Sequence, residues 1–225
     1  MTSRAKVTSR KPSALTPATF ARALDEICRR DEDLARVVAE FGRPPMWGRE
    51  PGFPTLVLII LEQQVSLASA RAAYERLAAA ASPLTPHALL AFDDAALRSF
   101  GFSRQKTDYT RRLARAVLAG HFDPHALGRM TDDAARAELI KLKGVGAWTA
   151  EIYLLMALRR PDAFPASDLA LMIAAERVKR LSARPSADEL NALAEGWRPW
   201  RSVAARVLWQ HYLGAAAARR KRTTA

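Results

Sequence analysis

The sequence predicts an all-α protein, and three observations support that fold class. Helix start and stop signals recur from one end of the chain to the other, and no run of alternating apolar and polar residues is bounded by hairpin turns. Alanine, the strongest helix former, is abundant. At 225 residues, 49% of them hydrophobic, the chain has the size and composition of one large globular domain or two small ones packed together.

The expected helices follow one another from residue 16 onward. The first starts at Thr16-Pro17, where a capping residue precedes a proline at the first helical position. The second runs from about Asp31 to Phe41, and the third contains the wholly apolar run 56–61, which belongs in the middle of a bundle. Further helical segments are expected at residues 71–77, around 89, around 97, at 105–119 and at 131–142.

The charge of the chain suggests a polyanionic partner. The formal net charge is +12, and Lys and Arg gain affinity for nucleic acid by releasing its counterions. Eight of these charges lie in segments 1–17 and 214–225, which carry no acidic residue. We therefore expect basic flexible tails at 1–15 and 215–225, and charge alone supports nucleic-acid binding only moderately.

Cysteine content and hydropathy exclude several classes of protein. The single cysteine, Cys28, excludes an internal disulfide and a four-cysteine iron-sulfur cluster, and the four histidines lack metal-ligand spacing. The longest apolar run, 56–61, is too short to cross a bilayer, and the first residues lack a secretory signal. We expect a cytoplasmic protein of bacterial type, associated with the nucleoid and with no membrane partner.

Residues 139–150 read Leu-Ile-Lys-Leu-Lys-Gly-Val-Gly-Ala-Trp-Thr-Ala: a helix end, a Gly-x-Gly turn and a second helix start. Gly144 and Gly146 allow a tight turn and close approach of a DNA backbone, while Val145 should plug the turn into the core. The free N–H groups of the second helix carry positive partial charge, which suits a phosphate. Taken alone, such a turn could equally be a plain connection between two helices.

The segment Phe164-Pro165-Ala166-Ser167-Asp168 follows this turn by about twenty residues. Together they resemble the helix-hairpin-helix (HhH-GPD) DNA glycosylase superfamily, and are most similar to the 3-methyladenine DNA glycosylase II group. The resemblance runs from about Gly52 to Leu213, with support from segments 61–66, 101–106 and 197–202. It implies two helical subdomains, 16–55 plus 165–214 and 56–164, with a DNA-binding cleft between them.

The resemblance makes Asp168 the catalytic carboxylate. Breaking an N-glycosidic bond builds positive charge on the sugar, which a fixed carboxylate stabilises while it orients water. The plainer interpretation, a helix N-cap, is compatible with that role. Glycosylases that also cut the strand carry a lysine where this chain has Trp148. We therefore expect a monofunctional enzyme that uses water, leaves an abasic site and requires no cofactor.

The resemblance also assigns a base pocket. Trp148 and Trp200 match its tryptophans, whose faces would attract a positively charged alkylated purine, whereas Trp197 and Trp209 are expected in the core. Ile152 occupies a position where relatives carry a tyrosine, and Tyr153 is next to it, so both are assigned to the pocket.

Gln64 matches the side chain that fills the gap left by an everted nucleotide, and Gln63 either assists it or caps a buried helix. The other residues expected to contact DNA are Ser66, Arg104, Lys106, Lys143, Gly144, Val145, Gly146, Thr149 and Arg201. The family also suggests a structural monovalent cation on the backbone carbonyls of the hairpin.

The leading hypothesis is a monomeric glycosylase that removes alkylated purines from double-stranded DNA. A glycosylase for another lesion, such as a deaminated base, is the nearest alternative. A non-catalytic helix-hairpin-helix module would bind DNA without needing the carboxylate. A helical protein-interaction domain would show no salt-dependent DNA binding.

Overall fold

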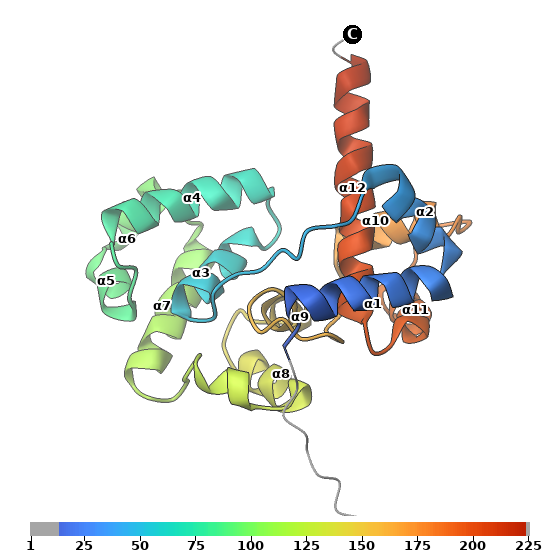
Figure 1. Cartoon of the computed structure of the whole chain (residues 1–225). Coiled ribbons are helices and arrows are strands. Elements are labelled where there is room, and N and C mark those ends of the chain that lie inside the picture. Colours follow the sequence, from blue (N-terminus) through green and yellow to red (C-terminus); the bar gives the residue numbers. More distant parts are fainter. Residues whose placement is uncertain (1–13, 224–225) are drawn as a thin grey trace, which may run out of the picture.

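The computed structural model describes residues 14–223, and this part of the chain contains twelve α-helices, two short 3-10 turns and no strand (Figure 1). The prediction of an all-α fold is therefore confirmed. None of the described helices is long and apolar enough to cross a membrane.

One group of helices combines the two ends of the chain: α1 (Pro17–Arg30), α2 (Glu32–Phe41), α10 (Leu169–Val178), α11 (Ala187–Ala194) and α12 (Arg201–Thr223). The side chain of Thr16 caps α1, as the Thr16-Pro17 pair predicts, and Asp31 caps α2. Helix α12 packs against α1, α2 and α10, so it is the centre of this group (Figure 1).

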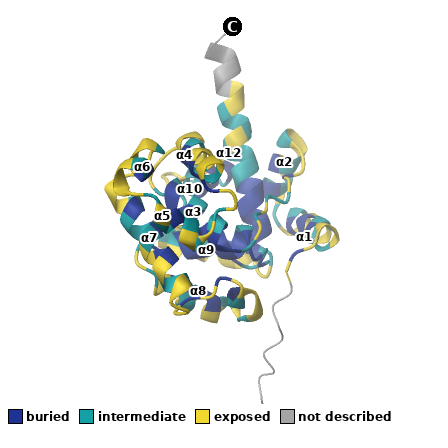
Figure 2. Cartoon of the chain, turned by 90° about the vertical axis from the view of Figure 1, so that its left-hand side faces the viewer, coloured by how far each residue is buried: buried dark blue, intermediate teal, exposed yellow. Residues whose placement is uncertain are grey.

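The second group comprises α3 (Phe53–Glu62), α4 (Leu67–Ala80), α5 (Pro86–Ala91), α6 (Asp94–Ser99), α7 (Arg104–Leu118), α8 (Asp132–Ile140) and α9 (Ala147–Met156). Helix α3 packs against α4, α7 and α9, and seven of its ten residues are buried. The apolar run 56–61 therefore lies in the middle of the bundle, as predicted. Figure 2 shows the same pattern, with buried residues inside and exposed residues on the outer helices.

Buried Arg206 joins the two groups. Its guanidinium, on α12, donates to the carbonyls of Leu155 in α9 and Trp47 in the connector between α2 and α3, at 3.1 and 2.9 Å. Burial lowers the pKa of Arg206 to about 10, so the group remains charged at neutral pH. The buried cation thus fixes the end of α9 relative to α12.

Parts of both predicted tails belong to the folded chain. Helix α12 continues to Thr223 through the segment 215–223, where four consecutive alanines favour helix. At the other end, Leu15 is buried and its N–H donates to the Arg159 carbonyl, so the chain is anchored before residue 16. The remainder of both predicted tails, 1–13 and 224–225, lies outside the described residues.

Candidate active site in a cleft between the helix groups

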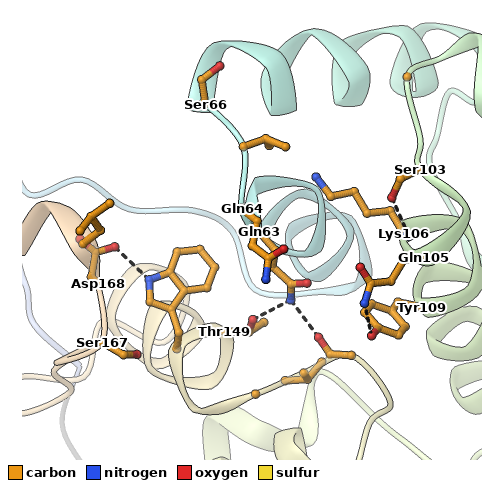
Figure 3. Close-up of a pocket in the computed structure, with 17 residues that line it drawn as sticks. Gln63, Gln64, Ser66, Ser103, Gln105, Lys106, Tyr109, Thr149, Ser167 and Asp168 are labelled. Atoms are coloured by element: carbon orange, nitrogen blue, oxygen red, sulfur yellow. Dashed lines mark hydrogen bonds between the residues drawn. The ribbon is translucent and has the colours of Figure 1, made fainter. Parts of the chain in front are cut away.

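A cleft of about 1220 Å³ is lined by four segments: the α3–α4 loop (residues 63–66), the start of α7 with the residues before it, the hairpin with the start of α9, and residues 167–169. Figure 3 shows these segments facing one another, with Asp168 on one side and Lys106 on the other. The chain thus brings together most of the residues predicted for DNA binding and catalysis.

Three hydrogen bonds orient the Asp168 carboxylate. Its Oδ2 accepts from the indole Nε1 of Trp148 at 2.9 Å, and its Oδ1 accepts from the indole Nε1 of Trp209 at 3.1 Å. Oδ1 also accepts from the backbone N–H of Leu171 at 3.0 Å, which makes Asp168 the N-cap of α10. The carboxylate both caps the helix and lines the cleft. Because all three donors are neutral, they fix its orientation without cancelling its charge.

The hairpin between α8 and α9 has two glycines with different roles. Gly144 has a φ of +88°, and a Cβ there would overlap with the ring of Tyr109 on α7. Gly146 has no atom within 4 Å of a Cβ position and precedes α9 with no side-chain cap. Val145 is buried, as predicted, so the turn is plugged into the core while the N–H groups that begin α9 lack a side-chain partner.

The α3–α4 loop presents one glutamine to the cleft and uses the other internally. The Gln63 Nε2 donates to the Gly144 carbonyl and to the Thr149 Oγ1, both at 2.8 Å. Gln64 is exposed and has a φ of +57°, a conformation that residues other than glycine rarely adopt. Ser66 caps α4 through the N–H of Ser69. Gln64 therefore lines the cleft, where its gap-filling role stays a prediction, and Gln63 is committed to the hairpin.

Residues 57–199 match the HhH-GPD superfamily of base excision DNA repair proteins. The chain belongs to this superfamily. The match includes the cleft segments, the hairpin and Asp168.

Two curated relatives and one solved structure illustrate the similarity of this superfamily member to known proteins. It is 32% identical to a Bacillus subtilis DNA-3-methyladenine glycosylase over 47% of this chain and 35% of that protein. It is 29% identical to DNA-3-methyladenine glycosylase 1 of Schizosaccharomyces pombe over 80% of this chain and 82% of that protein. A solved structure of an S. pombe 3-methyladenine DNA glycosylase in complex with abasic DNA covers 84% of this chain and 95% of its own, at 26% identity and a TM-score of 0.78.

The length of this HhH-GPD chain differs from that of several relatives. It spans 44%, 35% and 60% of the lengths of three curated proteins that it matches.

The tryptophan prediction is half right in this HhH-GPD domain. Trp148 lines the cleft, but Trp200 does not; its indole donates to Glu26 of α1 at 2.9 Å. Trp209, expected in the core, reaches Asp168 instead, whereas Trp197 is buried as predicted. Trp200 precedes α12 and Trp209 lies within it, so the two indoles meet different partners.

Ile152 and Tyr153 do not line the cleft either. Ile152 is 4% exposed, and Tyr153 is fully buried, with its hydroxyl accepting from the Gly52 N–H at 2.9 Å. Burial raises the pKa of Tyr153 to about 12. Both residues lie one turn beyond Trp148 and Thr149, where α9 has entered the core, so their assignment to the base pocket is wrong.

The basic residues predicted to contact DNA differ in their surroundings: some are exposed, one lines the cleft and one is buried. Lys143 and Arg104 are exposed, although Arg104 lies outside the main cleft and beside a smaller cavity of about 320 Å³. Lys106 lines the main cleft and donates to the Leu61 carbonyl, and burial lowers its pKa.

Arg201 is not available to DNA. It is 9% exposed and donates to both carboxylate oxygens of Asp162, at 2.9 and 3.0 Å. The assignment of Arg201 to DNA is therefore wrong, because the adjacent acid engages its guanidinium.

Tyr109 and the hairpin carbonyls complete the description of the cleft. Tyr109, which packs on Gly144 and lines the cleft, was not predicted, since an aromatic residue within an amphipathic helix gives no signal of its partner. Among the described residues, no group of three or more His, Cys, Asp or Glu could hold a metal ion. The cation expected on the hairpin carbonyls stays a prediction.

Proposed function

We propose that this protein is a monofunctional DNA glycosylase that everts an alkylated purine of the 3-methyladenine type from duplex DNA and hydrolyses its N-glycosidic bond. The product is an abasic site in an intact strand. Relatives named as 3-methyladenine DNA glycosylases support this substrate class, one of them across 80% of this chain. We further propose that the protein acts as a single subunit and that hydrolysis requires no cofactor.

The observation that carries the proposal is the Asp168 carboxylate, which is oriented by three neutral donors and lines the cleft. As the bond from C1′ to the base nitrogen breaks, its electron pair leaves with the base and positive charge grows on the sugar. A preorganised carboxylate stabilises that charge without having to reorient. Water then bonds to C1′, and Asp168 accepts the proton that the water loses.

The residues around the carboxylate suit an electron-poor base. A purine methylated on a ring nitrogen is positively charged, and it becomes a neutral leaving group when the bond breaks, so no acid is needed to protonate it. Trp148 lines the cleft and offers an aromatic face to such a cation. Its N–H already donates to Asp168, so the indole can recognise the base through its face and not through its N–H.

The strand beside the lesion would be gripped by the hairpin. Gly146 is exposed, the start of α9 has no side-chain cap, and Lys143 is exposed on the approach to the turn. A phosphate at this point would receive backbone N–H groups and the positive end of the helix dipole. Gln64 would fill the gap left by the everted base. The related S. pombe glycosylase bound to abasic DNA supports a DNA duplex as the partner.

The decisive experiment compares base release by the wild-type protein and Asp168→Asn on duplex DNA that contains a methylated purine. Asparagine is also a strong N-cap residue, so the start of α10 should survive. We expect at least a roughly hundredfold fall in single-turnover base release, the scale of removing one preorganised electrostatic group, with duplex binding retained. Borohydride should trap no covalent adduct between protein and DNA, because position 148 holds a tryptophan and not a lysine.

Asp93→Asn is the matched control. Asp93 caps α6 through the N–H of Ala96 at 2.7 Å, so the same substitution is made at another helix N-cap. It should leave base release unchanged. An Asp168→Asn protein with the wild-type rate would refute the role of the carboxylate. Wild-type protein that binds duplex but releases no alkylated, oxidised or deaminated base would instead indicate a non-catalytic DNA-binding module.

A further inference from the structure

We infer that Gln63 is a positioning residue that couples the α3–α4 loop to the hairpin, so that gap filling by Gln64 and the grip on the strand depend on one another. The inference rests on the proposed function, because it concerns how the base is everted. It assigns to Gln63 no contact with DNA.

The end of α3 is held from two sides before the loop begins. The Leu61 carbonyl accepts a hydrogen bond from Lys106 on α7 at 2.5 Å. Glu62 pairs with Arg49 through two hydrogen bonds, at 2.8 and 2.6 Å, and its side chain is 8% exposed. These contacts fix the helix end, but neither reaches the hairpin.

Gln63 makes the connection to the hairpin. One N–H of its amide donates to the Gly144 carbonyl in the turn, and the other donates to the Thr149 hydroxyl in the first turn of α9. A carbonyl can only accept, so the amide nitrogen must face the hairpin. Both amide hydrogens are therefore used inside the protein. The side chain thus contacts two residues that lie 81 and 86 positions after Gln63 in the sequence.

The next residue explains why this bridge matters. Gln64 has a φ of +57°, which residues other than glycine rarely adopt. Because this residue carries a Cβ, its backbone is strained in this conformation. Such a conformation persists only when neighbouring contacts hold it. The Gln63 bridge precedes Gln64 directly, and Ser66 fixes the other end by capping α4. Without the bridge, Gln64 can relax to a negative φ and carry its side chain away from the cleft.

The fraction of molecules with the loop in place would then set the rate of eversion. The test is Gln63→Leu, which keeps the approximate size of the side chain and removes both hydrogen bonds. Single-turnover base release is measured on two duplexes, one with the methylated purine paired and one with the same purine in a single-base bulge. An unpaired base costs less to evert, so it depends less on the loop.

On the paired duplex we expect base release by Gln63→Leu to fall roughly tenfold to thirtyfold, the equivalent of losing one to two net hydrogen bonds. On the bulged duplex it should stay within about threefold of wild type. Gln210→Leu is the matched control, because Gln210 also donates its amide to a carbonyl, that of Phe41 at 2.7 Å, but does not line the cleft. Any effect of Gln210→Leu on base release should be the same for the paired and the bulged duplex.

Thr149→Val provides a second, independent measurement. It removes one acceptor of the bridge, so its effect and that of Gln63→Leu should be less than additive on the paired duplex. Equal losses on both duplexes, strict additivity, or an unchanged Gln63→Leu rate would each overturn the inference. A wild-type protein that releases no base would refute the proposed function instead. Fluorescence of 2-aminopurine beside an abasic analogue would then still report whether Gln63→Leu weakens distortion of the duplex.

Discussion

The same substitution should have different effects at the two glycines of the hairpin: at Gly144 it should lower stability, and at Gly146 it should weaken DNA binding. Gly144→Ala places a methyl group where the Tyr109 ring lies and forces alanine into a φ of +88°. Gly146→Ala places a methyl group where no atom lies within 4 Å, at an ordinary extended φ of −95°. The pair therefore separates the demands of folding from those of DNA approach, two residues apart.

The size of each effect follows from the local geometry. The left-handed conformation costs alanine about 1–2 kcal/mol, and displacing a packed ring costs about 1–3 kcal/mol. Gly144→Ala should therefore lower the free energy of unfolding by about 2–5 kcal/mol, which corresponds to a fall of about 5–15 °C in Tm for a chain of this size. Gly146→Ala should change stability by less than about 0.5 kcal/mol, because it meets no neighbour and slightly restricts the unfolded chain.

Two assays check the contrast. Thermal unfolding followed by circular dichroism gives Tm, and fluorescence anisotropy gives the Kd for a duplex with an abasic analogue. Gly146→Ala should keep its Tm and bind DNA more weakly, since the methyl group stands between the α9 N–H groups and a phosphate. Equal Tm losses in both variants would refute the steric argument. So would a normal Tm for Gly144→Ala. Adding Tyr109→Ala to Gly144→Ala should recover part of the lost stability, which an unrelated folding defect would not.

Two further predictions concern Trp209, which donates to Asp168, and Asp31, which caps α2. Trp209→Phe keeps an aromatic ring but removes one N–H donor to the Asp168 carboxylate. Base release in single-turnover assays should fall about tenfold to hundredfold, which is the range for a hydrogen bond to a charged group. An unchanged rate would contradict the orienting role of Trp209. Burial tends to raise the pKa of Asp31, but hydrogen bonds from Lys179 and Trp197 outweigh it and hold the pKa below its usual value. The contribution of the Asp31 charge to stability is therefore complete above about pH 4 and is lost as pH falls through the lowered pKa. Asp31→Asn keeps the N-cap but removes this charge. In urea unfolding between about pH 6 and 3, its free energy of unfolding should fall less steeply with pH than that of the wild type.

Local signals in the sequence were sufficient for much of the fold. Thr16 and Asp31 cap helices that begin where the sequence predicts them, and these caps involve only residues two or three positions away. The position of the Gly-x-Gly turn is equally local, since glycine adopts the positive φ of Gly144 without strain. Asp168 was found through its spacing from that turn within a family pattern. Its cap on Leu171 is also local.

Prediction failed where a side chain had to choose among distant partners. Arg201 resembles a phosphate contact in sequence, yet Asp162 engages it, 39 residues earlier in the chain. Gln63 resembles a DNA contact beside Gln64, yet its amide reaches the hairpin. In each case a buried polar group takes the nearest partner that satisfies its hydrogen bonds, and that partner depends on how the helices pack.

The amino-acid sequence by itself determined where helices start, where the chain turns on glycine, and which carboxylate follows the turn, because these depend on backbone preferences over a few residues. Tertiary structure alone decided that Trp209, and not Trp200, reaches Asp168. The two tryptophans have the same chemistry and nearly the same position in the chain. Trp209 lies within α12, which packs against α10, whereas Trp200 precedes α12 and meets Glu26 of α1. Which indole reaches Asp168 therefore depends on how these helices pack together.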